Sequence, residues 1–394
     1  MIRCARDEVN ATRFFRWIMN YRSVDHNIML HPPTLEAWTK GSDPERDIAV
    51  LMSGGVDSSV TALLLRDAGW NVLGITMKIP VAENCDAKRS CCGLEAGYVA
   101  RDLGIAHYYL DVREAFHKLV IDPFRRDYAR GRTPSPCVDC NTLFKFGLVW
   151  DFLEEQFGIK NLATGHYARV VHSDDEAYLM RGDDHSRDQS YFLYGIPRQR
   201  LPWFHLPLGT LSKDEVRKLA RKAKLPVARR QDSMELCFAA EGDYRAALDS
   251  QPAKGPILDA DGNVIGEHDG IANYTVGQRK GVGIAAGKPV YVIRVSAADN
   301  SITVGTREQV ETRDVSAEEA NNLISELARA GQILYGKIRS QGEPCKCLLT
   351  LADGHNISVR FDEVQFAPTA GQRLVLYDEH DRVVAGGVIV TADS

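Results

Sequence analysis

Two cysteines set three residues apart are the first feature of the sequence that could do chemistry. Cys137 and Cys140 lie in the polar stretch "SPCVDCN", which we expect to be a loop. A thiolate is a nucleophile and a metal ligand, so the pair suits covalent catalysis or zinc binding. A zinc site usually needs a second close pair, and Cys91–Cys92 and Cys345–Cys347 lack the usual spacing. We favour nucleophilic chemistry; zinc and a chance pairing in a surface loop stay as alternatives.

A further cysteine, Cys237, stands apart in "DSMELCFAAEGDY". One cysteine of a pair can carry sulfur as a persulfide while a second cysteine attacks or resolves it. Cys237 is therefore a candidate partner for Cys140. The alternative is a small buried side chain with no chemical role.

The stretch "SGGVDSS" (Ser53–Ser59) has the features of a phosphate-binding loop. Its two glycines allow a tight turn whose N–H groups converge on an anion, and the following helix adds its positive end. Ser53 and Ser58 can donate hydroxyl hydrogen bonds. Asp57 fits beside a phosphate only with a cation between them, which predicts Mg²⁺. The loop is not a Walker motif, because Gly-Lys-Ser/Thr is absent. It resembles the PP-loop of ATP pyrophosphatases, which split ATP between the α and β phosphates.

Alternating strands and helices must position these groups. Apolar runs predict four strands, and the segments between them have helical spacing, which favours a parallel sheet wrapped by helices. Ser212 and Glu215 predict a capping box at the start of another helix. The predicted strands are Asp47–Met52, Asn71–Met77, Ala106–Val112 and Lys160–His166.

Beyond about residue 245 the pattern changes to short strands separated by turns, which is all-β material. Val315–Gly331 is predicted to be a helical or linking segment. We expect an extension over 1–45, a PP-loop α/β domain over 46–244, a central β domain over 245–312 and a C-terminal β-barrel over 313–394.

Composition limits the class of protein. The chain has 394 residues, 44% hydrophobic and 26% charged, which is typical of a globular protein, and it has no apolar stretch long enough for a membrane span. The net charge of −5 means that nucleic acid must be bound by a local basic patch. Nine cysteines, an odd number, indicate reduced thiols and predict a cytoplasmic protein without membrane contact.

Six motifs occur in an order that resembles the bacterial tRNA-uridine 2-sulfurtransferases, the 2-thiouridylases of the wobble uridine. The motifs are "SGGVDSSV", "CVDCNTLFKF", "LATGHYAR", "RDQSYFL", "ELCFAAEGDY" and "YTVGQRKGVGI". The resemblance implies ATP and Mg²⁺ as cofactors and tRNA as substrate, with tRNAs for Lys, Glu and Gln expected. It also implies a persulfide donor, either a relay protein or a cysteine desulfurase.

The resemblance also implies roles for individual residues. Cys140 matches the nucleophile and Cys237 matches the cysteine that takes up the persulfide, with a Cys140–Cys237 disulfide as a possible intermediate. Many members have Asp where this chain has Cys137. The positions implied to bind ATP are Leu51, Met52, Ser53, Gly54, Gly55, Val56, Asp57, Ser58, Met77 and Gly165. Those implied to meet tRNA are Ser135, Pro136, Cys137, His166, Arg187, Asp188, Gln189, Arg339 and Gln372.

Two other functions stay open at this point. A PP-loop synthetase that uses ammonia on a small molecule would need neither the cysteine pair nor the β domains. An RNA-binding protein with a zinc-stabilised loop would contain stoichiometric zinc. Local alternatives also remain: His166 as a loop histidine, "DQSYFL" as packing, and the basic run Arg217–Arg230 as a solvated helix face rather than a phosphate track.

Overall fold

The computed structural model describes residues 27–34, 36–80, 95–173, 176–230, 236–239, 244–248, 253–284 and 289–390. Most of the expected N-terminal extension lies outside the described residues, as do Cys4, Cys85, Cys91 and Cys92. Within the described residues, no helix combines the length and the apolar character needed to cross a bilayer.

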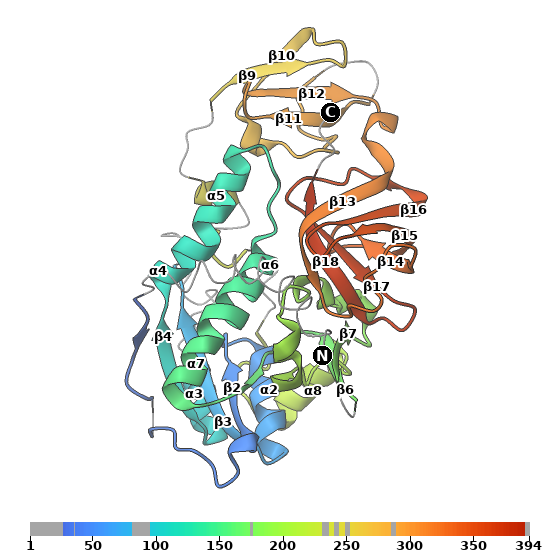
Figure 1. The fold of residues 1–394 in the computed structure, drawn as a ribbon. Helices are drawn as coiled ribbons and strands as arrows, with labels where there is room; N and C mark the ends of the chain where they lie inside the picture. Colours follow the sequence, from blue (N-terminus) through green and yellow to red (C-terminus); the bar gives the residue numbers. More distant parts are fainter. Residues whose placement is uncertain are drawn as a thin grey trace.

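A six-stranded sheet forms the first part of the molecule, with the order β1-β4-β3-β2-β5-β8 (Figure 1). Neighbouring strands are parallel except for β1, which pairs antiparallel with β4. All four predicted strands are present, and the parallel α/β class is confirmed. The strands are β1 (Met29–Leu30), β2 (Asp47–Leu51), β3 (Asn71–Lys78), β4 (Ala106–Asp111), β5 (Asn161–Ala163) and β8 (Phe204–His205).

Side chains alternate across β2 and so divide the core into two layers. Ala49 and Leu51 pack into one cluster with Phe116 and Trp150, whereas Ile48 and its neighbours pack into the other. This two-residue period is the geometry of a strand that is covered on both faces. One face is covered by α2 (Val56–Asp67), α3 (Glu95–Leu103) and α8 (Lys213–Lys222), and the other by α4 (Arg113–Phe116), η2 (His117–Ile121), α5 (Asp122–Ala129), α6 (Pro136–Asp139), η3 (Cys140–Val149) and α7 (Trp150–Phe157).

Between β5 and α8 the chain forms a hairpin and several short 3-10 helices. The hairpin contacts the C-terminal part of the molecule, in part through a β-bridge between Met180 and Arg382. The predicted capping box is confirmed, because Ser212 and Glu215 bond each other's backbone at the start of α8. The elements are β6 (Ala168–His172), β7 (Ala177–Arg181), η4 (His185–Arg187), η5 (Ser190–Phe192) and η6 (Arg198–Trp203).

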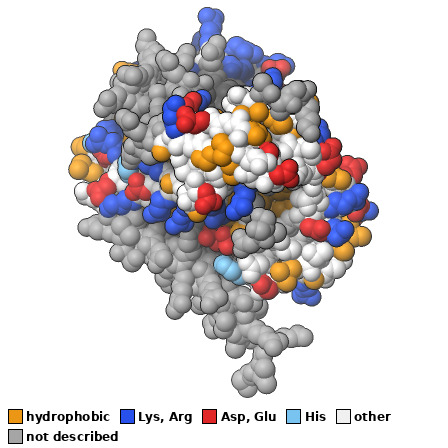
Figure 2. All heavy atoms as spheres, turned by 90° about the horizontal axis from the view of Figure 1, so that it is seen from above, with side chains coloured by type: hydrophobic (Ala, Val, Ile, Leu, Met, Phe, Trp, Pro, Cys, Tyr) orange, Lys and Arg blue, Asp and Glu red, His pale blue; other side chains and the backbone are white. Residues whose placement is uncertain are grey.

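A small four-stranded sheet follows, ordered β10-β9-β12-β11, with η7 (Tyr244–Ala247) before it and η8 (Ile271–Asn273) within it. Its core is small and includes Ile257, Val292 and Ile302. Figure 2 shows the molecule from above, with acidic and basic side chains interspersed around apolar ones. Charge on this described face is therefore mixed. The strands are β9 (Gly255–Leu258), β10 (Val264–His268), β11 (Tyr291–Ser296) and β12 (Ser301–Gly305).

The C-terminal part is a closed antiparallel barrel, as predicted, with the order β13-β16-β15-β14-β17-β18. The helical or linking segment predicted for Val315–Gly331 was wrong over its first half, which belongs to β13. Val315 and Ala317 point into the barrel core, and β13 pairs with both β16 and β18, so tertiary pairing overrides local helix propensity. The strands are β13 (Glu311–Asn322), β14 (Ile333–Lys337), β15 (Cys345–Ala352), β16 (Ile357–Phe366), β17 (Arg373–Tyr377) and β18 (Val383–Val390), with η9 (Glu308–Val310) before them.

Candidate active site

The nucleotide loop lies at the carboxyl end of β2, where parallel sheets commonly bind ligands. Gly54 has a φ of 75°, a left-handed conformation that glycine adopts without strain. The Ser58 hydroxyl accepts from the Ser53 N–H at 3.1 Å and closes the loop. Leu51, Met52 and Val56, which the sequence assigned to the ATP site, are buried, so their side chains belong to the core.

Asp57, in the first turn of α2, is held by two residues from other elements. The Lys213 ammonium donates to both carboxylate oxygens at 2.8 Å, and the Tyr167 hydroxyl donates to Oδ1 at 2.8 Å. The Asp57 side chain keeps 31% of its surface exposed, against 7% for Lys213. A protein cation therefore already lies beside this carboxylate, at the place where the sequence predicted Mg²⁺.

Gly165 packs against the nucleotide loop, and Gln189 fixes a residue that bonds the loop. A Cβ atom on Gly165 would lie 2.8 Å from the Ser58 nitrogen and 2.9 Å from the Asp57 carbonyl carbon, so only glycine fits. The Gln189 Oε1 accepts from the Tyr167 N–H at 2.9 Å, and the Gln189 N–H donates to the Tyr167 carbonyl at 2.8 Å. Gln189 therefore fixes the tyrosine that bonds Asp57. Met77 lies near the end of β3 and packs partly buried against the core.

Cys137 and Cys140 lie in a helix rather than in the expected loop. The helix begins at Pro136, whose fixed φ suits a first helical position, and continues without a break through η3 into α7. Residues three apart on a helix share a face, so the two thiols lie one turn apart on the same side. Cys137 is exposed and Cys140 is half-buried.

Polar side chains surround the turn after Cys140. Asn141 donates from Nδ2 to the Phe192 carbonyl at 2.9 Å and accepts from the Lys145 ammonium at 2.9 Å. Burial, with a smaller effect of the Lys145 charge, holds the pKa of His166 well below its ordinary value, so this imidazole is neutral. Its Nδ1 lies 2.7 Å from the Thr164 hydroxyl. Lys145 thus places a positive charge close to the residue that follows Cys140.

The Cys237 segment is linked to the helix that carries Cys140 through Phe116 of α4. Phe238 contacts the ring of Phe116 with 6.0 Å between centroids, and Phe116 contacts Phe144 at 5.2 Å. Phe144 lies one helical turn after Cys140. Both cysteines are half-buried and pack against the same core cluster. The two segments, far apart in the sequence, therefore line one aromatic core, with Phe116 between them.

Arg187, Asp188 and Gln189, adjacent in the sequence, have different surroundings. The Arg187 side chain is exposed on η4. The Asp188 side chain is 1% exposed, accepts from the N–H groups of Gly182 and Ser190, and pairs with Arg181 at 3.5 Å. Asp188 is therefore a structural residue in this geometry, and Arg187 is the member of the three whose side chain faces solvent.

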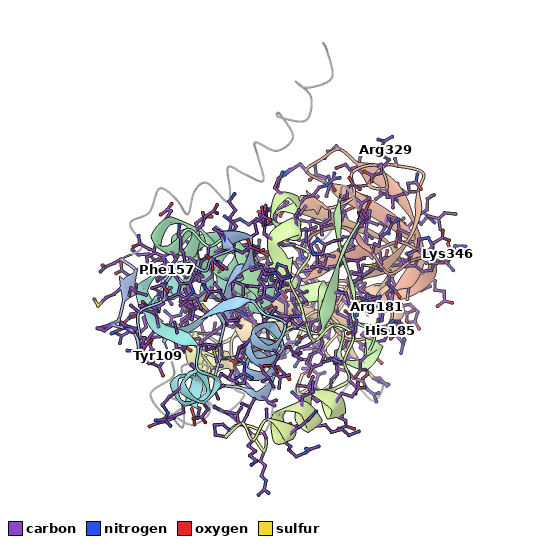
Figure 3. The ribbon with its side chains drawn as sticks, turned by 90° about the horizontal axis from the view of Figure 1, so that it is seen from below. Tyr109, Phe157, Arg181, His185, Arg329 and Lys346 are labelled. Carbon is purple, nitrogen blue, oxygen red and sulfur yellow. The ribbon has the colours of Figure 1, made fainter. Side chains whose placement is uncertain are left out.

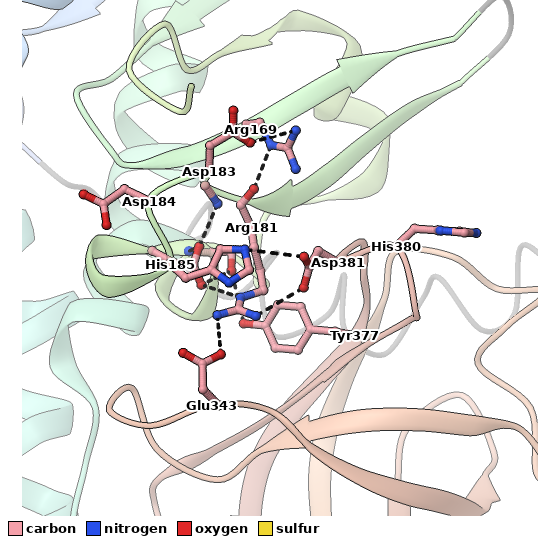
Figure 4. Close-up of polar contacts among 12 residues, drawn as sticks. Arg169, Arg181, Asp183, Asp184, His185, Glu343, Tyr377, His380 and Asp381 are labelled. Carbon is pink, nitrogen blue, oxygen red and sulfur yellow. Dashed lines mark hydrogen bonds and ion pairs between the residues drawn. The ribbon is translucent and has the colours of Figure 1, made fainter. Parts of the chain in front are cut away.

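Arg181 also joins this region to the barrel. Its guanidinium reaches Glu343 at 2.8 Å and Asp381 at 3.2 Å, and both acids lie in barrel loops (Figure 4). Seen from below, Arg181 and His185 lie close to each other at one edge of the barrel, while Arg329 and Lys346 lie on its outer side (Figure 3). The two parts are thus joined by a buried arginine that pairs with two more exposed acids.

The remaining tRNA candidates lie at the entry to the cysteine helix and in two segments of the barrel. Ser135 is 8% exposed and precedes the cysteine helix, next to buried Pro136 and exposed Cys137. Gln372 lies just before β17 and donates from Nε2 to the Thr133 carbonyl at 3.1 Å. Arg339, exposed after β14, donates to the Phe366 carbonyl. Gln372 therefore joins the cysteine-helix entry, whereas Arg339 lies elsewhere on the barrel.

Sequence reasoning missed several residues of the site, among them Lys213, Tyr167 and Lys145. One signal was available for Lys213. Lysine at the first position of a helix opposes the helix dipole, so a compensating acidic partner was to be expected. Nothing in the local sequence identified Asp57 as that partner.

Comparisons with known proteins cover nearly the whole chain. Three family models match in order: tRNA methyl transferase HUP domain over 46–241, tRNA methyl transferase PRC-barrel domain over 247–306, and Aminomethyltransferase beta-barrel domain over 312–389. A relative from Syntrophus aciditrophicus, "tRNA-specific 2-thiouridylase MnmA 1", is 42% identical, with 88% of this chain and 94% of the relative covered. Relatives from Anaplasma marginale and Geobacter metallireducens, both named "tRNA-specific 2-thiouridylase MnmA", are 40% and 41% identical; coverage is 90% and 88% of this chain, and 94% and 97% of the relatives.

Proposed function

The chain belongs to the family of tRNA-specific 2-thiouridylases, and on that basis we propose that it uses ATP to replace the C2 oxygen of a tRNA wobble uridine with sulfur. The observation that supports the proposal for this chain is the aromatic link from Phe238, beside Cys237, through Phe116 to Phe144 on the Cys140 helix. A reaction that passes sulfur from one cysteine to a second reactant needs both cysteines at one site.

Activation of the base comes first. The wobble base leaves its stack, because a C2 carbonyl inside stacked RNA cannot be reached. Its oxygen attacks the α phosphate of ATP, forming the O-adenylated uridine and releasing pyrophosphate. The N–H groups and hydroxyls of Ser53–Ser58 bind the phosphates, and Gly165 leaves room for the loop to stay tight. The C2 oxygen, which is a poor leaving group by itself, can then leave as part of AMP.

Mg²⁺ enters the proposal with the ATP phosphates. The described residues contain no group of three or more His, Cys, Asp or Glu side chains that could hold a metal. A cation at this site would be held by Asp57 and by ATP itself, which is a common arrangement for Mg²⁺. The partly exposed Asp57 carboxylate fits that role. The metal would neutralise phosphate charge, and Lys213 would share that task from the protein side.

Sulfur transfer uses the two cysteines. Cys237 receives the terminal sulfur of a persulfide donor, a relay protein or a cysteine desulfurase, and becomes Cys–S–SH. Cys140 then attacks the inner sulfur of Cys237 in one of two orders. It either releases hydrosulfide, which attacks C2 and expels AMP, or it acts after the terminal sulfur has attacked C2 and expelled AMP, and so breaks the S–S bond that joins the base to Cys237. Both orders give 2-thiouridine and a Cys140–Cys237 disulfide, so both require a thiol reductant for the next turnover.

Binding of tRNA is proposed for the side chains around the cysteine helix and for the exposed Arg187 and Arg339. Their charge suits contacts to phosphate, which position RNA without reading its sequence. Cys137, exposed one turn before Cys140, lies where a base would approach the nucleophile. The expected substrates are tRNAs for Lys, Glu and Gln.

The direct test is mass analysis of tRNA incubated with the protein, ATP and a persulfide donor. We expect one oxygen to be replaced by sulfur at the wobble uridine, and AMP to form only with tRNA present. AMP formed equally well without tRNA would support the ammonia-dependent synthetase instead. If no AMP and no modified tRNA are formed, and the protein contains one zinc per chain, the result would support the RNA-binding alternative.

A further inference from the structure

Asp139, between the two cysteines of the helix, forms an ion pair with the barrel. The Arg373 guanidinium donates to Asp139 Oδ1 at 2.5 Å, and the two side chains are 4% and 14% exposed. Arg373 is the first residue of β17, so the pair joins the turn that carries Cys140 to a barrel strand. Burial raises the pKa of Asp139, while the Arg373 charge and hydrogen bond oppose that shift.

Arg373 is itself held firmly. Its Nη1 donates to the Gly371 carbonyl at 2.6 Å. Its backbone N–H donates to the Tyr191 hydroxyl at 3.2 Å, and that hydroxyl donates to the Arg373 carbonyl at 3.0 Å. Tyr191 is 1% exposed. These bonds fix the orientation of the Arg373 guanidinium. The guanidinium can therefore fix the position of the Asp139 carboxylate that it bonds.

The segment that leads into the helix has a second set of bonds to the same strand. Thr133 donates from its N–H to the Ala370 carbonyl at 2.9 Å and accepts from Gln372 at 3.1 Å. Gly371 has a φ of 91°, and a Cβ atom there would lie 2.8 Å from the Thr133 carbonyl oxygen. Residues 370–373 of the barrel thus contact both the segment that enters the helix, at Thr133, and the fourth residue of the helix, Asp139.

We propose that the barrel positions the nucleophilic thiol, with Arg373 acting through Asp139 to fix the helical turn from which Cys140 reaches Cys237 and the base. Arg373 is a positioning residue in this account and touches no reacting atom. The inference rests on the proposed function, because it assumes that Cys140 is the nucleophile.

Other contacts dock the barrel independently of this pair. Asn321 of β13 donates to the Tyr194 and Ile196 carbonyls at 2.6 and 2.8 Å, and Arg181 binds Glu343 and Asp381. Loss of the Asp139 contact should therefore misplace the turn without releasing the barrel. Glu343, whose side chain is 68% exposed, offers a matched control at the same interface.

The test variant is the double substitution Asp139→Asn with Arg373→Met. It removes both charges together, so no buried charge is left without its partner, and it removes the ion pair. We expect the single-turnover rate of thiolation, with Cys237 preloaded with persulfide, to fall by about 10- to 100-fold, the scale for a misplaced reacting group. The KM for tRNA and tRNA-dependent pyrophosphate release should stay within about twofold of wild type, because those steps use neither thiol.

Two further variants make the result specific. Arg373→Lys keeps the charge and should recover most of the rate, while Glu343→Gln removes an interface ion pair away from Cys140 and should leave the rate unchanged. A double variant with the wild-type rate, or equal losses in the double variant and in Glu343→Gln, would overturn the inference. A double variant that fails to fold would also overturn it, since the barrel would then depend on this pair. If Cys140→Ser still thiolates tRNA, the proposed function itself fails, which is a different result.

Discussion

At the residue scale, Asp57 shows how a tertiary partner changes an expected effect. From the sequence, Asp57→Ala should abolish nucleotide-dependent activity, because it removes the expected Mg²⁺ ligand, and should leave the fold intact, because the loop is expected to be exposed. In the structure the same change removes the carboxylate that a 7% exposed lysine bonds at two oxygens. Removing one partner of a buried ion pair commonly lowers the free energy of unfolding by about 3–5 kcal/mol. The loss should be smaller here, because the Asp57 side chain is partly exposed.

We therefore expect Asp57→Asn to lose ATP-dependent activity and also to lower the melting temperature. The double variant Asp57→Asn with Lys213→Met should regain stability but not activity. Pyrophosphate release and thermal unfolding measure the two effects separately. Near-normal pyrophosphate release by Asp57→Asn would remove the basis for assigning this loop to ATP.

The two cysteines make a second residue-scale prediction. Cys237→Ser should bind tRNA and ATP but accept no label from a persulfide donor, whereas Cys140→Ser should accept the label and retain it. Neither should make 2-thiouridine, and Cys345→Ser, in the barrel, should stay active. Peptide mapping of oxidised wild type should find a Cys140–Cys237 crosslink. Label on Cys237→Ser, or thiolation by Cys140→Ser, would mean that the roles are misassigned.

At the scale of elements, the turn after β5 packs directly on the start of α2. Gly165→Ala should push the Asp57–Ser58 backbone, because its Cβ would lie within 3.1 Å of three loop atoms. We expect weaker ATP binding by calorimetry and a stability loss of about 1–3 kcal/mol. Gly97→Ala in α3 is the control, since its Cβ would meet the Tyr109 hydroxyl at 3.1 Å, the far end of a side chain. ATP affinity equal in both variants would contradict this account.

Buried histidines on the strands predict a pH dependence of stability. Burial lowers the pKa of His107, and also that of His205, from 6.5 to about 4. The unfolded chain therefore binds more protons than the folded one between pH 6.5 and 4, so the free energy of unfolding falls as the pH falls through that window. At pH 5 each histidine should account for about 2 kcal/mol of loss relative to pH 8.

Urea unfolding at pH 8 and pH 5 measures this dependence, at pH values where most carboxylates stay ionised. His107→Gln should reduce the loss by about 2 kcal/mol, because Gln has no proton to gain. Stability that is equal at the two pH values would show that these imidazoles are charged in the folded protein. The effect bears on the site, since the Thr76 hydroxyl bonds both His107 and the Met52 carbonyl at 2.8 Å, just before the nucleotide loop.

At the scale of the whole molecule, the question is whether metal or packing holds the cysteine helix. Asp139–Arg373, Gln372–Thr133 and the Phe116 contacts join that helix to the barrel and to the Cys237 segment. Packing and buried charge therefore supply what a zinc site would otherwise supply. We expect the purified protein to carry no stoichiometric zinc by elemental analysis. One zinc per chain that is lost in Cys140→Ser would contradict this and favour the RNA-binding alternative.

Local patterns were sufficient for much of the architecture. β2, the glycine loop and the capping box of α8 follow from residues within about six positions of each other, and each local preference there agrees with the final fold. The family was recognisable for the same reason, because its motifs are short and ordered. The roles of the individual site residues stay predictions.

Local patterns failed where a distant partner decides. Val315–Asn322 has helix-forming residues, yet it is a strand because two neighbouring strands accept its hydrogen bonds. Cys137 and Cys140 were expected in a loop, but Pro136 begins a helix whose position the barrel secures. Lys213 beside Asp57 and Arg373 beside Asp139 could not be inferred, because each pair is more than one hundred residues apart in the chain. Such contacts depend on how finished elements pack, and that is settled by the shapes and charges of whole surfaces.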